Sequence, residues 1–311
     1  MNELICPVCK NKIRDNVLSG GDYISGEEFS LIGCFDCEIV VTDFGPDKKN
    51  LGDYYGDQYY GNRKSLSEDV INRLRIRQIF KIAGIAPRKL LDIGCGNGSF
   101  FMKFRELGWL AFGTELAPPE HLKNGAGEFI YKGDLMENSF ESVSFELVTM
   151  WHSLEHISNP LEYMKEALRI LKDGGVLIAE VPNFRSWQSQ IFKENWFHLD
   201  VPRHLMHFSP KGLAVLLQKA GFRNVEVTAG SFIYQIYGYL QSILNFFSRR
   251  KNMLFDLLNG KIDLTAAAKA HPIDLIVNII LFLPAAAFSL IFSVLEILSG
   301  RSGIILVSAK K

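Results

Sequence analysis

The stretch LLDIGCGNG, residues 90–98, decides the fold, because it joins an apolar run to a turn rich in glycine. Gly94, Gly96 and Gly98 alternate with other residues, and a helix is expected to begin near Ser99. Glycine lets a backbone approach a ligand without a Cβ in the way, and the first turn of a helix offers unpaired N–H groups. The pattern predicts a strand, a ligand-binding turn and a helix, with a nucleotide-type ligand at the carboxyl end of the strand.

Strand and helix patterns alternate on both sides of this turn. Apolar runs predict strands at 89–94, 109–116, 128–134, 145–152, 176–182, 222–229 and 303–311. Helical spacing predicts helices at 66–83, 99–108, 160–172 and 210–221, the first of them from Leu66, Val70, Leu74, Ile76 and Ile79. Such alternation implies βαβ units on a mostly parallel sheet. We expect a doubly wound, Rossmann-like α/β domain over 66–229, whose seven-stranded sheet is completed by 303–311.

The spacing of the glycines bears on the identity of the ligand. The dinucleotide fingerprint G-x-G-x-x-G, counted from Gly94, would require glycine at position 99, which is Ser99. Glu115 ends the second predicted strand about twenty residues further on, where a carboxylate can bind ribose hydroxyls, as it does in NAD enzymes. A purely structural turn with a surface glutamate is the alternative.

With these motifs the chain resembles the class I S-adenosylmethionine-dependent methyltransferases. The matching segments are LLDIGCGNG, GTEL at 113–116, GDL at 133–135, HSLEHISNP at 152–160 and LKDGGVLIAEVPN at 171–183. The resemblance covers 85–229 and the terminal strand. It implies that Gly94, Gly96 and Gly98 cradle the amino-acid part of the cofactor and that Asp92 orients the loop. By the same resemblance, Glu115 holds the ribose, and Asp134 and Leu135 contact the adenine. Met150 and Trp151 would line the far side of the pocket.

Histidines follow the fourth predicted strand. His152, Glu155 and His156 are similar to the E-x-x-E-H stretch of ubiquinone-biosynthesis O-methyltransferases. Since His152 replaces the first Glu, the divalent-metal role in that family is not carried over. O-methylation near neutral pH needs a base, and histidine has a suitable pKa. His156 and His152 are therefore candidate catalytic groups, although His156 could instead only hydrogen-bond within the segment that follows.

A second polar stretch, residues 198–207, follows the fifth predicted strand. It contains His198, Asp200, Arg203, His204 and His207. One interpretation is substrate recognition with proton transfer by His204 or His207, and the other is that these histidines only shape the start of the next helix. The Tyr-rich linker at 46–65 contains Tyr54, Tyr55, Tyr59 and Tyr60, which could form a lid over the cofactor or pack between modules.

Four of the five cysteines form two C-x-x-C pairs, Cys6 with Cys9 and Cys34 with Cys37. Four thiolates suit a closed tetrahedral zinc site, which would be structural because it has no open position. We therefore expect a small zinc ribbon at 1–45, with unmetallated cysteines as the alternative. Together with YYGDQYYG at 54–61, the arrangement resembles the zinc-binding front module of some sugar methyltransferases. Cys95 is expected to be a small buried residue.

An apolar insertion at 230–302 separates the sixth strand from the last. It contains an aromatic stretch at 232–247 and an apolar run at 275–295, which is long enough to span a bilayer. A single crossing would leave the strand at 303–311 on the wrong side of the membrane. We expect a helical hairpin, bent at Leu283–Pro284, that dips into one leaflet through 271–299. A helical cap or a homo-oligomer face is the alternative.

The composition narrows the functional class. Lys plus Arg and Asp plus Glu number 34 each, so no general electrostatic hold on nucleic acid is expected. The segment MNELICPVCK lacks an apolar signal core, which predicts a cytoplasmic protein, peripheral on the membrane face. The expected function is methyl transfer from S-adenosylmethionine to a small-molecule acceptor such as a lipid, a quinone or a lipid-linked glycan precursor. An NAD-dependent oxidoreductase, and a zinc-module binding protein with a degenerate Rossmann domain, are the alternatives.

Overall fold

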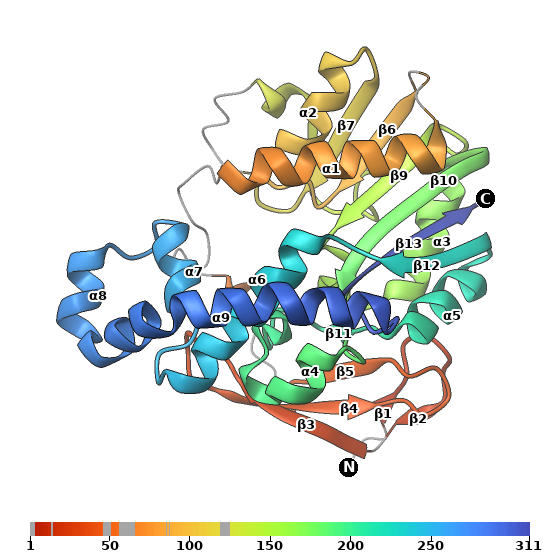
Figure 1. Cartoon of the computed structure of the whole chain (residues 1–311). Helices are drawn as coiled ribbons and strands as arrows, with labels where there is room; N and C mark the ends of the chain where they lie inside the picture. The colour runs from red at the N-terminus through yellow and green to blue at the C-terminus, as the bar shows by residue number, and fades with distance from the viewer. Residues whose placement is uncertain are drawn as a thin grey trace.

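The computed structural model describes residues 4–13, 15–45, 51–55, 66–84, 86, 88–118 and 125–311. Three parts follow one another along the chain. A small sheet lies at the N-terminal side, a large sheet covered by helices forms the body, and a group of helices projects from it (Figure 1).

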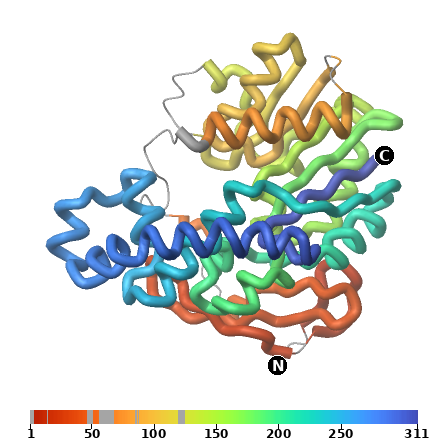
Figure 2. Tube along the Cα trace, in the orientation of Figure 1, coloured from red at the N-terminus to blue at the C-terminus, as the bar shows by residue number. Residues whose placement is uncertain are grey.

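The large sheet contains the seven predicted strands in the order β12-β13-β10-β9-β6-β7-β8, which confirms the doubly wound Rossmann-like fold. Neighbouring strands are parallel, except that β13 runs antiparallel between β10 and β12. Figure 2 traces the last segment of the chain back into this sheet, next to its β12 edge. The strands are β6 (Lys89–Ile93), β7 (Leu110–Glu115), β8 (Ile130–Lys132), β9 (Phe145–Trp151), β10 (Leu171–Pro182), β12 (Arg223–Ala229) and β13 (Ile304–Lys310).

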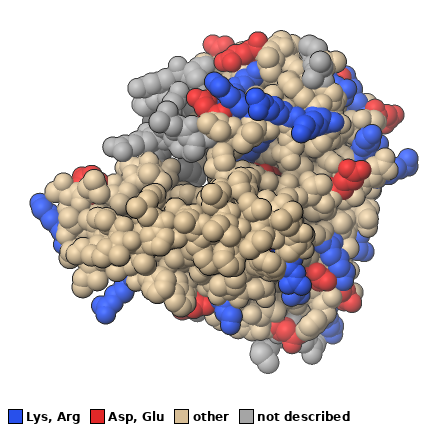
Figure 3. Space-filling model, viewed as in Figure 1, with Lys and Arg blue, Asp and Glu red and all other residues tan. Residues whose placement is uncertain are grey.

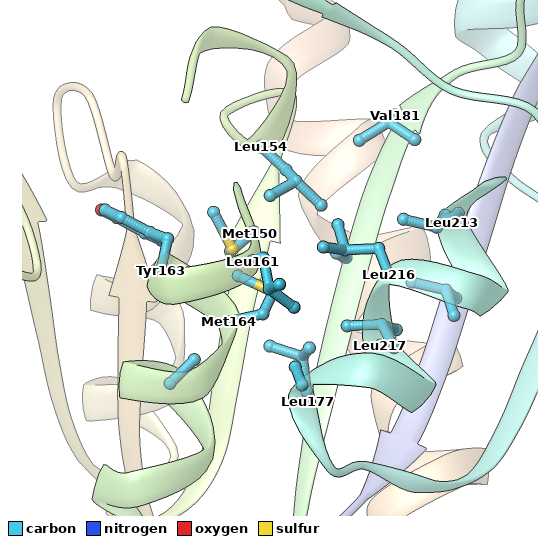
Figure 4. Packing of buried hydrophobic residues seen from close by; sticks show 14 of the residues in the cluster. Met150, Leu154, Leu161, Tyr163, Met164, Leu177, Val181, Leu213, Leu216 and Leu217 are labelled. Carbon is cyan, nitrogen blue, oxygen red and sulfur yellow. The ribbon is translucent and has the colours of Figure 1, made fainter. Parts of the chain in front are cut away.

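Helices cover both faces because successive side chains of a buried strand point in opposite directions. Leu90 joins a core with the helices on one face, and Leu91 joins a second core with the helices on the other. Figure 4 shows this second core, in which leucines of α5 meet Met164 of α3 over the sheet. The helices are α1 (Leu66–Ala83) and α2 (Ser99–Glu106) on the first face, with α3 (Pro160–Ile170) and α5 (Pro210–Ala220) on the second.

Two strands and one helix face differ from the sequence expectation. The third strand is short because residues 126–129 form the 3-10 turn η2 (Ala126–Phe129). Strand β10 begins at Leu171, with a register shift before Val176. Helix α1 has the predicted limits, but Val70 and Leu74 are about half exposed, while Ile71 and Ile79 are buried. Its inward stripe therefore also contains Arg75.

The N-terminal sheet is completed by residues from the large domain. Its order is β11-β5-β4-β3, and β11 (Met206–His207) comes after the fifth strand of the main sheet. Met206 pairs with Val41, and His207 pairs with Val40. The other strands of this sheet are β3 (Asp15–Gly21), β4 (Glu28–Gly33) and β5 (Val40–Asp43). Strands β1 (Leu4–Ile5) and β2 (Lys12–Ile13) form a separate two-stranded sheet, and η1 (Leu51–Tyr54) follows β5. The predicted module at 1–45 is thus a chain segment whose sheet also needs 206–207.

Arg203 joins the two sheets through a buried ion pair. Its side chain is fully buried, with Nη2 lying 2.7 Å from Asp22 Oδ1 and 2.8 Å from Asp200 Oδ1. Nη1 donates to the Tyr54 carbonyl oxygen at 3.2 Å. Since Asp22 belongs to the N-terminal part, burying this guanidinium requires both parts to be in place.

The insertion contains four helices, α6 (Phe232–Phe247), α7 (Met253–Leu258), α8 (Leu264–Ala270) and α9 (Pro272–Leu298). The expected hairpin bent at Leu283–Pro284 is wrong, because α9 continues through Pro284. Pro284 removes one backbone donor, but it lies on the exposed side of the helix, where the unpaired Ile280 carbonyl can tilt outward. Between β10 and the insertion, short elements connect the parts: α4 (Trp187–Phe192), η4 (Lys193–Asn195) and η5 (Phe197–Leu199).

The ion pair predicts a clear stability effect. Asp22→Asn should lower the free energy of unfolding by about 3 kcal/mol, the low end of the range for removing one partner of a buried pair, because Asp200 still neutralises Arg203. Urea denaturation of the whole chain measures this. The matched control is Asp15→Asn at the exposed start of β3, which should change stability by less than about 0.5 kcal/mol. Equal losses in the two variants would contradict the assigned role.

Candidate active site

The glycine turn follows β6 as predicted and needs glycine for two physical reasons. Gly94, Gly96 and Gly98 have φ values of 70°, 56° and 74°, which side-chain-bearing residues rarely adopt. A Cβ on Gly94 would lie 2.6 Å from Ser153 Cβ, and one on Gly98 would lie 2.8 Å from Ala126 Cβ. The turn is therefore pressed against the segment after β9 and leaves its backbone open on the other side.

A cavity of about 570 Å³ lies over this turn. Its volume is within the usual range of small-molecule sites. One wall is the turn itself with Asp92, Gly94 and Gly96, and another is the polar face of α1 with Asn72 and Arg75. The third wall is mostly aromatic or apolar, with Ile233, Tyr234, Tyr237, Phe255 and Leu258 from the insertion and Phe197 from η5. The cavity thus joins the predicted cofactor turn to a surface that the sequence analysis did not assign to the site.

The predicted cofactor residues lie beside the turn in different ways. Trp151, Asp92, Gly94 and Gly96 line the cavity. Asp92 accepts a hydrogen bond from Thr149 Oγ1 at 2.7 Å, and burial raises the pKa of its carboxyl to about 7. Glu115 Oε2 accepts from the Gly96 amide at 2.8 Å, which ties the turn to the end of β7.

The expected adenine turn follows β8. Asp134 Oδ1 accepts from the amides of Met136 and Glu137 at 2.8 and 3.0 Å, and the Leu135 amide donates to the Tyr163 hydroxyl at 3.2 Å. The Gly133 amide donates to the Glu115 carbonyl at 3.0 Å, so this turn lies next to the expected ribose site. Neither Asp134 nor Leu135 is among the described residues that line the cavity.

Met150 faces away from the expected pocket. Its side chain is fully buried in the core against α3, where Figure 4 shows it beside Leu154, Leu161 and Met164. The reason is the alternation along β9, since Trp151 already faces the cavity and its neighbour must face the other side of the sheet. The side-chain role implied for Met150 is therefore wrong, and its position leaves only its main chain near the turn.

Arg75 is a cavity residue that the sequence analysis missed. Its Nη2 lies 3.1 Å from Glu180 Oε1, and its guanidinium stacks over the Trp151 ring at 4.3 Å from the centroid. Its buried Nε has no hydrogen-bond partner among the described residues. A charged residue on the same stripe as Ile71 and Ile79 is the signal that could have identified it.

His152 is held as an imidazolium and cannot be a base near neutral pH. Its Nδ1 lies 3.5 Å from Glu155 Oε1, and its Nε2 lies 3.3 Å from Glu180 Oε1. Burial alone would lower its pKa, but the two carboxylates outweigh burial and raise the pKa of His152 to about 9. The structure therefore contradicts the interpretation of His152 as a proton acceptor.

His156 and His204 meet beside Glu155. One ring nitrogen of each histidine and one carboxylate oxygen of Glu155 lie within 4.8 Å of one another. His156 Nδ1 is 2.9 Å from the Arg203 carbonyl oxygen, and His204 Nδ1 is 2.9 Å from the His198 carbonyl oxygen. A carbonyl only accepts, so each Nδ1 donates a proton to its carbonyl, and Nε2 is the nitrogen with a lone pair whenever the ring is neutral. Neither oxygen of Glu155 accepts a hydrogen bond from a described residue.

We name these three neighbouring residues the His156 centre (Glu155, His156 and His204). Burial lowers the pKa of His204 to about 4, so its ring is neutral at neutral pH. Among the described residues no member of the centre lines the cavity. The centre nevertheless begins two residues after Ser153, which packs against Gly94.

The remaining predicted residues have structural partners. His207 Nε2 lies 3.0 Å from Thr42 Oγ1, and burial lowers its pKa to about 3, so His207 supports the N-terminal sheet. Tyr54 packs against Phe29 and donates to Glu27 at 2.8 Å, as the packing interpretation expected. Tyr55 Oη lies 2.9 Å from His156 Nδ1. Tyr59 and Tyr60 lie outside the described residues.

The four paired cysteines come together at the end of the N-terminal part. Cys6 Sγ lies 3.5 Å from Cys37 Sγ, and Cys9 Sγ lies 3.4 Å from Cys34 Sγ. All four sulfur atoms are within 4.8 Å of one another. Zinc with four thiolates at 2.3 Å requires sulfur–sulfur distances of about 3.8 Å. The donor set and its spacing therefore fit a closed tetrahedral zinc site.

Comparison with known proteins agrees with this geometry. A family model described as "Methyltransferase domain" matches residues 62–227, more than half of the chain. A ubiquinone biosynthesis O-methyltransferase from Ruegeria sp. (strain TM1040) is 28% identical over 157 residues, which cover 46% of this chain and 64% of that protein. One from Aromatoleum aromaticum is 24% identical, over 54% of this chain and 78% of that protein. The chain thus spans just under two thirds of the Ruegeria relative.

A solved structure shares the fold over most of the chain. It is a phosphoethanolamine N-methyltransferase from Haemonchus contortus in complex with S-adenosyl-L-methionine, at 16% identity and a TM-score of 0.52, over 96% of this chain and 69% of that one. At that identity it supports the fold alone. Because the family model covers both the glycine turn and the segment with His156, the chain belongs to the family of methyltransferase domains.

Proposed function

We propose that the chain transfers the methyl group of S-adenosylmethionine to a small-molecule acceptor in the cavity over the glycine turn. The observation that carries this proposal is a cavity of about 570 Å³ with two walls of unlike chemistry. The turn wall offers open backbone and suits the cofactor, while the wall from α6 and α7 is mostly aromatic and apolar and suits an organic acceptor.

The residues around the turn have the chemistry that this cofactor needs. The backbone of Gly94–Gly98 would hold its amino-acid part, Glu115 its ribose hydroxyls, and the turn at Asp134 and Leu135 its adenine. Arg75 adds a cation in the cavity wall that suits the cofactor carboxylate, because its side chain lines the cavity beside the glycine turn. Ser99 in place of glycine disfavours a dinucleotide.

Methyl transfer is an in-line displacement at the sulfonium carbon. An acceptor atom bonds to the methyl carbon, the sulfur–carbon bond breaks with its electron pair moving to sulfur, and the acceptor gives up a proton. The enzyme therefore has to position the acceptor and remove that proton. We assign the proton to His156 Nε2, since its Nδ1 is held by a backbone carbonyl and Glu155 can stabilise the resulting imidazolium.

We further propose that the acceptor is a lipid, a quinone or a lipid-linked glycan precursor, and that the enzyme works on the cytoplasmic face of a membrane. The support is α9, a helix long and apolar enough to cross a membrane by length and composition, which the fold places on the surface. The names of the curated relatives, ubiquinone biosynthesis O-methyltransferases, point to the same class of acceptor.

The zinc site has a structural role in this proposal. A four-thiolate site has no open position for chemistry. Its sheet pairs with β11, next to the loop that carries His204 and Arg203, so an ordered N-terminal part would keep the His156 centre in place.

Calorimetry with S-adenosylmethionine, its demethylated product and NAD tests the assigned cofactor. The first two should bind in the micromolar range, about −8 kcal/mol. Glu115→Ala should weaken both by roughly 1.5–3 kcal/mol, the value of a hydrogen bond to a charged group. Glu128→Ala, at an exposed glutamate of η2, is the matched control and should bind as the wild type does. Tight NAD binding without S-adenosylmethionine binding would overturn the assignment.

His156→Ala should lower turnover by roughly 10²–10⁴-fold, the usual effect of losing a general base. Turnover is measured as methyl label passed from S-adenosylmethionine to lipid and sugar extracts, and cofactor affinity should stay within about twofold. Adding His204→Ala to the His156→Ala variant should lower turnover by a smaller factor than His204→Ala does in the wild type. The reason is that the effects of residues that act as a unit are not additive. Unchanged turnover in His156→Ala would remove the role from this centre.

Metal analysis of protein purified without chelators should find about one zinc per chain. Cys34→Ser should release the metal and lower the thermal stability of the chain, since structural zinc contributes to folding. The matched control is Cys95→Ser, which should retain zinc because Cys95 lies in the glycine turn, away from the four-sulfur cluster. Zinc-free wild-type protein would refute the site.

A further inference from the structure

Helix α9 has its polar side chains inside and its apolar side chains outside. Its buried residues are mainly polar or charged: Asp274, Asn278, Ala285, Ser289, Ser293 and Glu296. Surface helices of soluble domains have the opposite arrangement, with an apolar stripe toward the core and polar residues toward water. Helices whose outer face meets lipid pack instead through small and polar residues.

Most inward polar groups are bonded within the protein, although Asn278 Oδ1 and Ser293 Oγ have no hydrogen-bond partner among the described residues. Asn278 Nδ2 donates to Ser248 Oγ at 3.0 Å, and Asp274 Oδ1 accepts from the Arg249 amide at 2.9 Å. Further along the helix, Glu296 Oε1 accepts from the Gln188 amide at 3.0 Å. The polar stripe is thus a built seam against α6 and α4, which fixes which side of α9 faces outward.

The outward side is apolar along the whole helix. Neither charged residue of α9, Asp274 or Glu296, is exposed, whereas Ile273, Leu283 and Leu298 are 74%, 75% and 78% exposed. At 100° per residue, the exposed large side chains span about half of the circumference. An apolar surface of this extent marks contact with another apolar phase.

Charge at the margins of this surface favours a lipid headgroup layer. Figure 3 shows a broad face without charge where α9 lies, with Lys and Arg together with some Asp and Glu at its edges. Among the described residues of the insertion and its end, the exposed cations Arg249, Lys269 and Arg301 outnumber the one exposed acid, Asp263, while Asp256 and Asp274 are buried and paired. Exposed cations beside an apolar face complement anionic headgroups.

The connections of the insertion set its orientation. The Gly230 amide donates to the Ile304 carbonyl oxygen at 2.9 Å, so the insertion leaves and rejoins the sheet at one point. Helix α6 is covered on its other side by the body, where the Phe197 amide donates to Ser242 Oγ at 2.9 Å. The outer side of α9 therefore faces away from the body along the length of the helix.

The same helices also form the acceptor wall of the cavity. Ile233 and Tyr237 of α6 line it, as do Phe255 and Leu258 of α7, which packs against α9. Leu258 is 57% exposed while it lines the cavity. Leu258 is thus an accessible apolar residue of the cavity, on a helix that packs against α9.

We propose that α9 lies in the plane of one membrane leaflet and that the acceptor is a lipid whose hydrocarbon chain passes beside Leu258 into the cavity. This inference rests on the proposed methyl transfer for the identity of the site, but its test does not require methyl transfer. Phospholipid chains cover the outer side of α9, and a polar head on the acceptor reaches the glycine turn.

Flotation with vesicles of phosphatidylcholine and phosphatidylglycerol tests the docking step. The full chain should float with the vesicles and remain bound in high salt. Ile280→Ser with Leu283→Ser should reduce flotation at least tenfold, whereas Leu107→Ser, at an exposed leucine after α2, should not. Calorimetry should show that the double variant binds S-adenosylmethionine as tightly as the wild type does, which verifies that the variant is folded. A soluble dimer that does not float, and that the double variant dissociates, would show a second copy as the occupant and overturn the proposal.

Photo-crosslinking tests the route. The probe is a sixteen-carbon alcohol with a diazirine at its far end, dissolved in the same vesicles, and cross-linked peptides are mapped by mass spectrometry. Cross-links should appear on the outer side of α9 and on the α7 segment with Phe255. Leu258→Glu should lower the α7 cross-links at least tenfold and leave those on α9 unchanged. Cross-links confined to α9 in the wild type would disprove the route, even if methyl transfer and cofactor binding are intact.

Discussion

The position of the last strand constrains every other part of the molecule. Strand β13 lies antiparallel between β10 and β12, and most of its side chains are buried. Removing it would expose both cores of the sheet, because consecutive residues of a central strand face opposite layers. The segment between Ala229 and Ile304 must therefore begin and end at the same place on the sheet. The insertion must therefore form a structure outside the domain, with its first and last residues next to each other at the sheet.

This constraint places the insertion beside the glycine turn. Helix α6 leaves the sheet near the carboxyl end of β10, on the edge where parallel strands present their ligands. Ser231 at its start donates its amide to Glu180 at 2.7 Å, and Glu180 also pairs with Arg75 and His152. One buried carboxylate thus joins the insertion, helix α1 and the segment after β9. The acceptor wall and the cofactor wall are positioned by the same residue.

A second group of buried charges orders the opposite side of the site. Arg203 is neutralised by Asp22 and Asp200, and its carbonyl holds the ring of His156. Forming this arrangement requires the N-terminal sheet, since Asp22 comes from it. The N-terminal part is therefore a scaffold for the loop with the histidines. Burial keeps His204 neutral, whereas His152 is cationic in spite of its burial, because it lies between the carboxylates of Glu155 and Glu180.

The sequence alone determined the seven strands of the large sheet, the glycine turn and the limits of α1. It also determined that the four cysteines of the two C-x-x-C pairs gather at one site. Those features depend on local spacing, such as alternation in a strand and Gly94-x-Gly96-x-Gly98 in a turn. The last strand could also be predicted, although the insertion separates it from the other strands in sequence. The apolar run at 303–311 is a strand pattern that fits the large sheet. The class of fold and the family followed from these local patterns.

Only the tertiary structure decided which side of each element faces what. Sequence periodicity placed Val70 and Leu74 on the inner side of α1, but packing selected the stripe with Arg75. Hydropathy identified α9 without showing that its polar residues point inward or that it continues through Pro284. Whether His152, His156 or His204 accepts a proton depends on carboxylates and carbonyls from distant segments. Such choices are set by contacts between residues far apart in the chain, and local spacing carries no information about them.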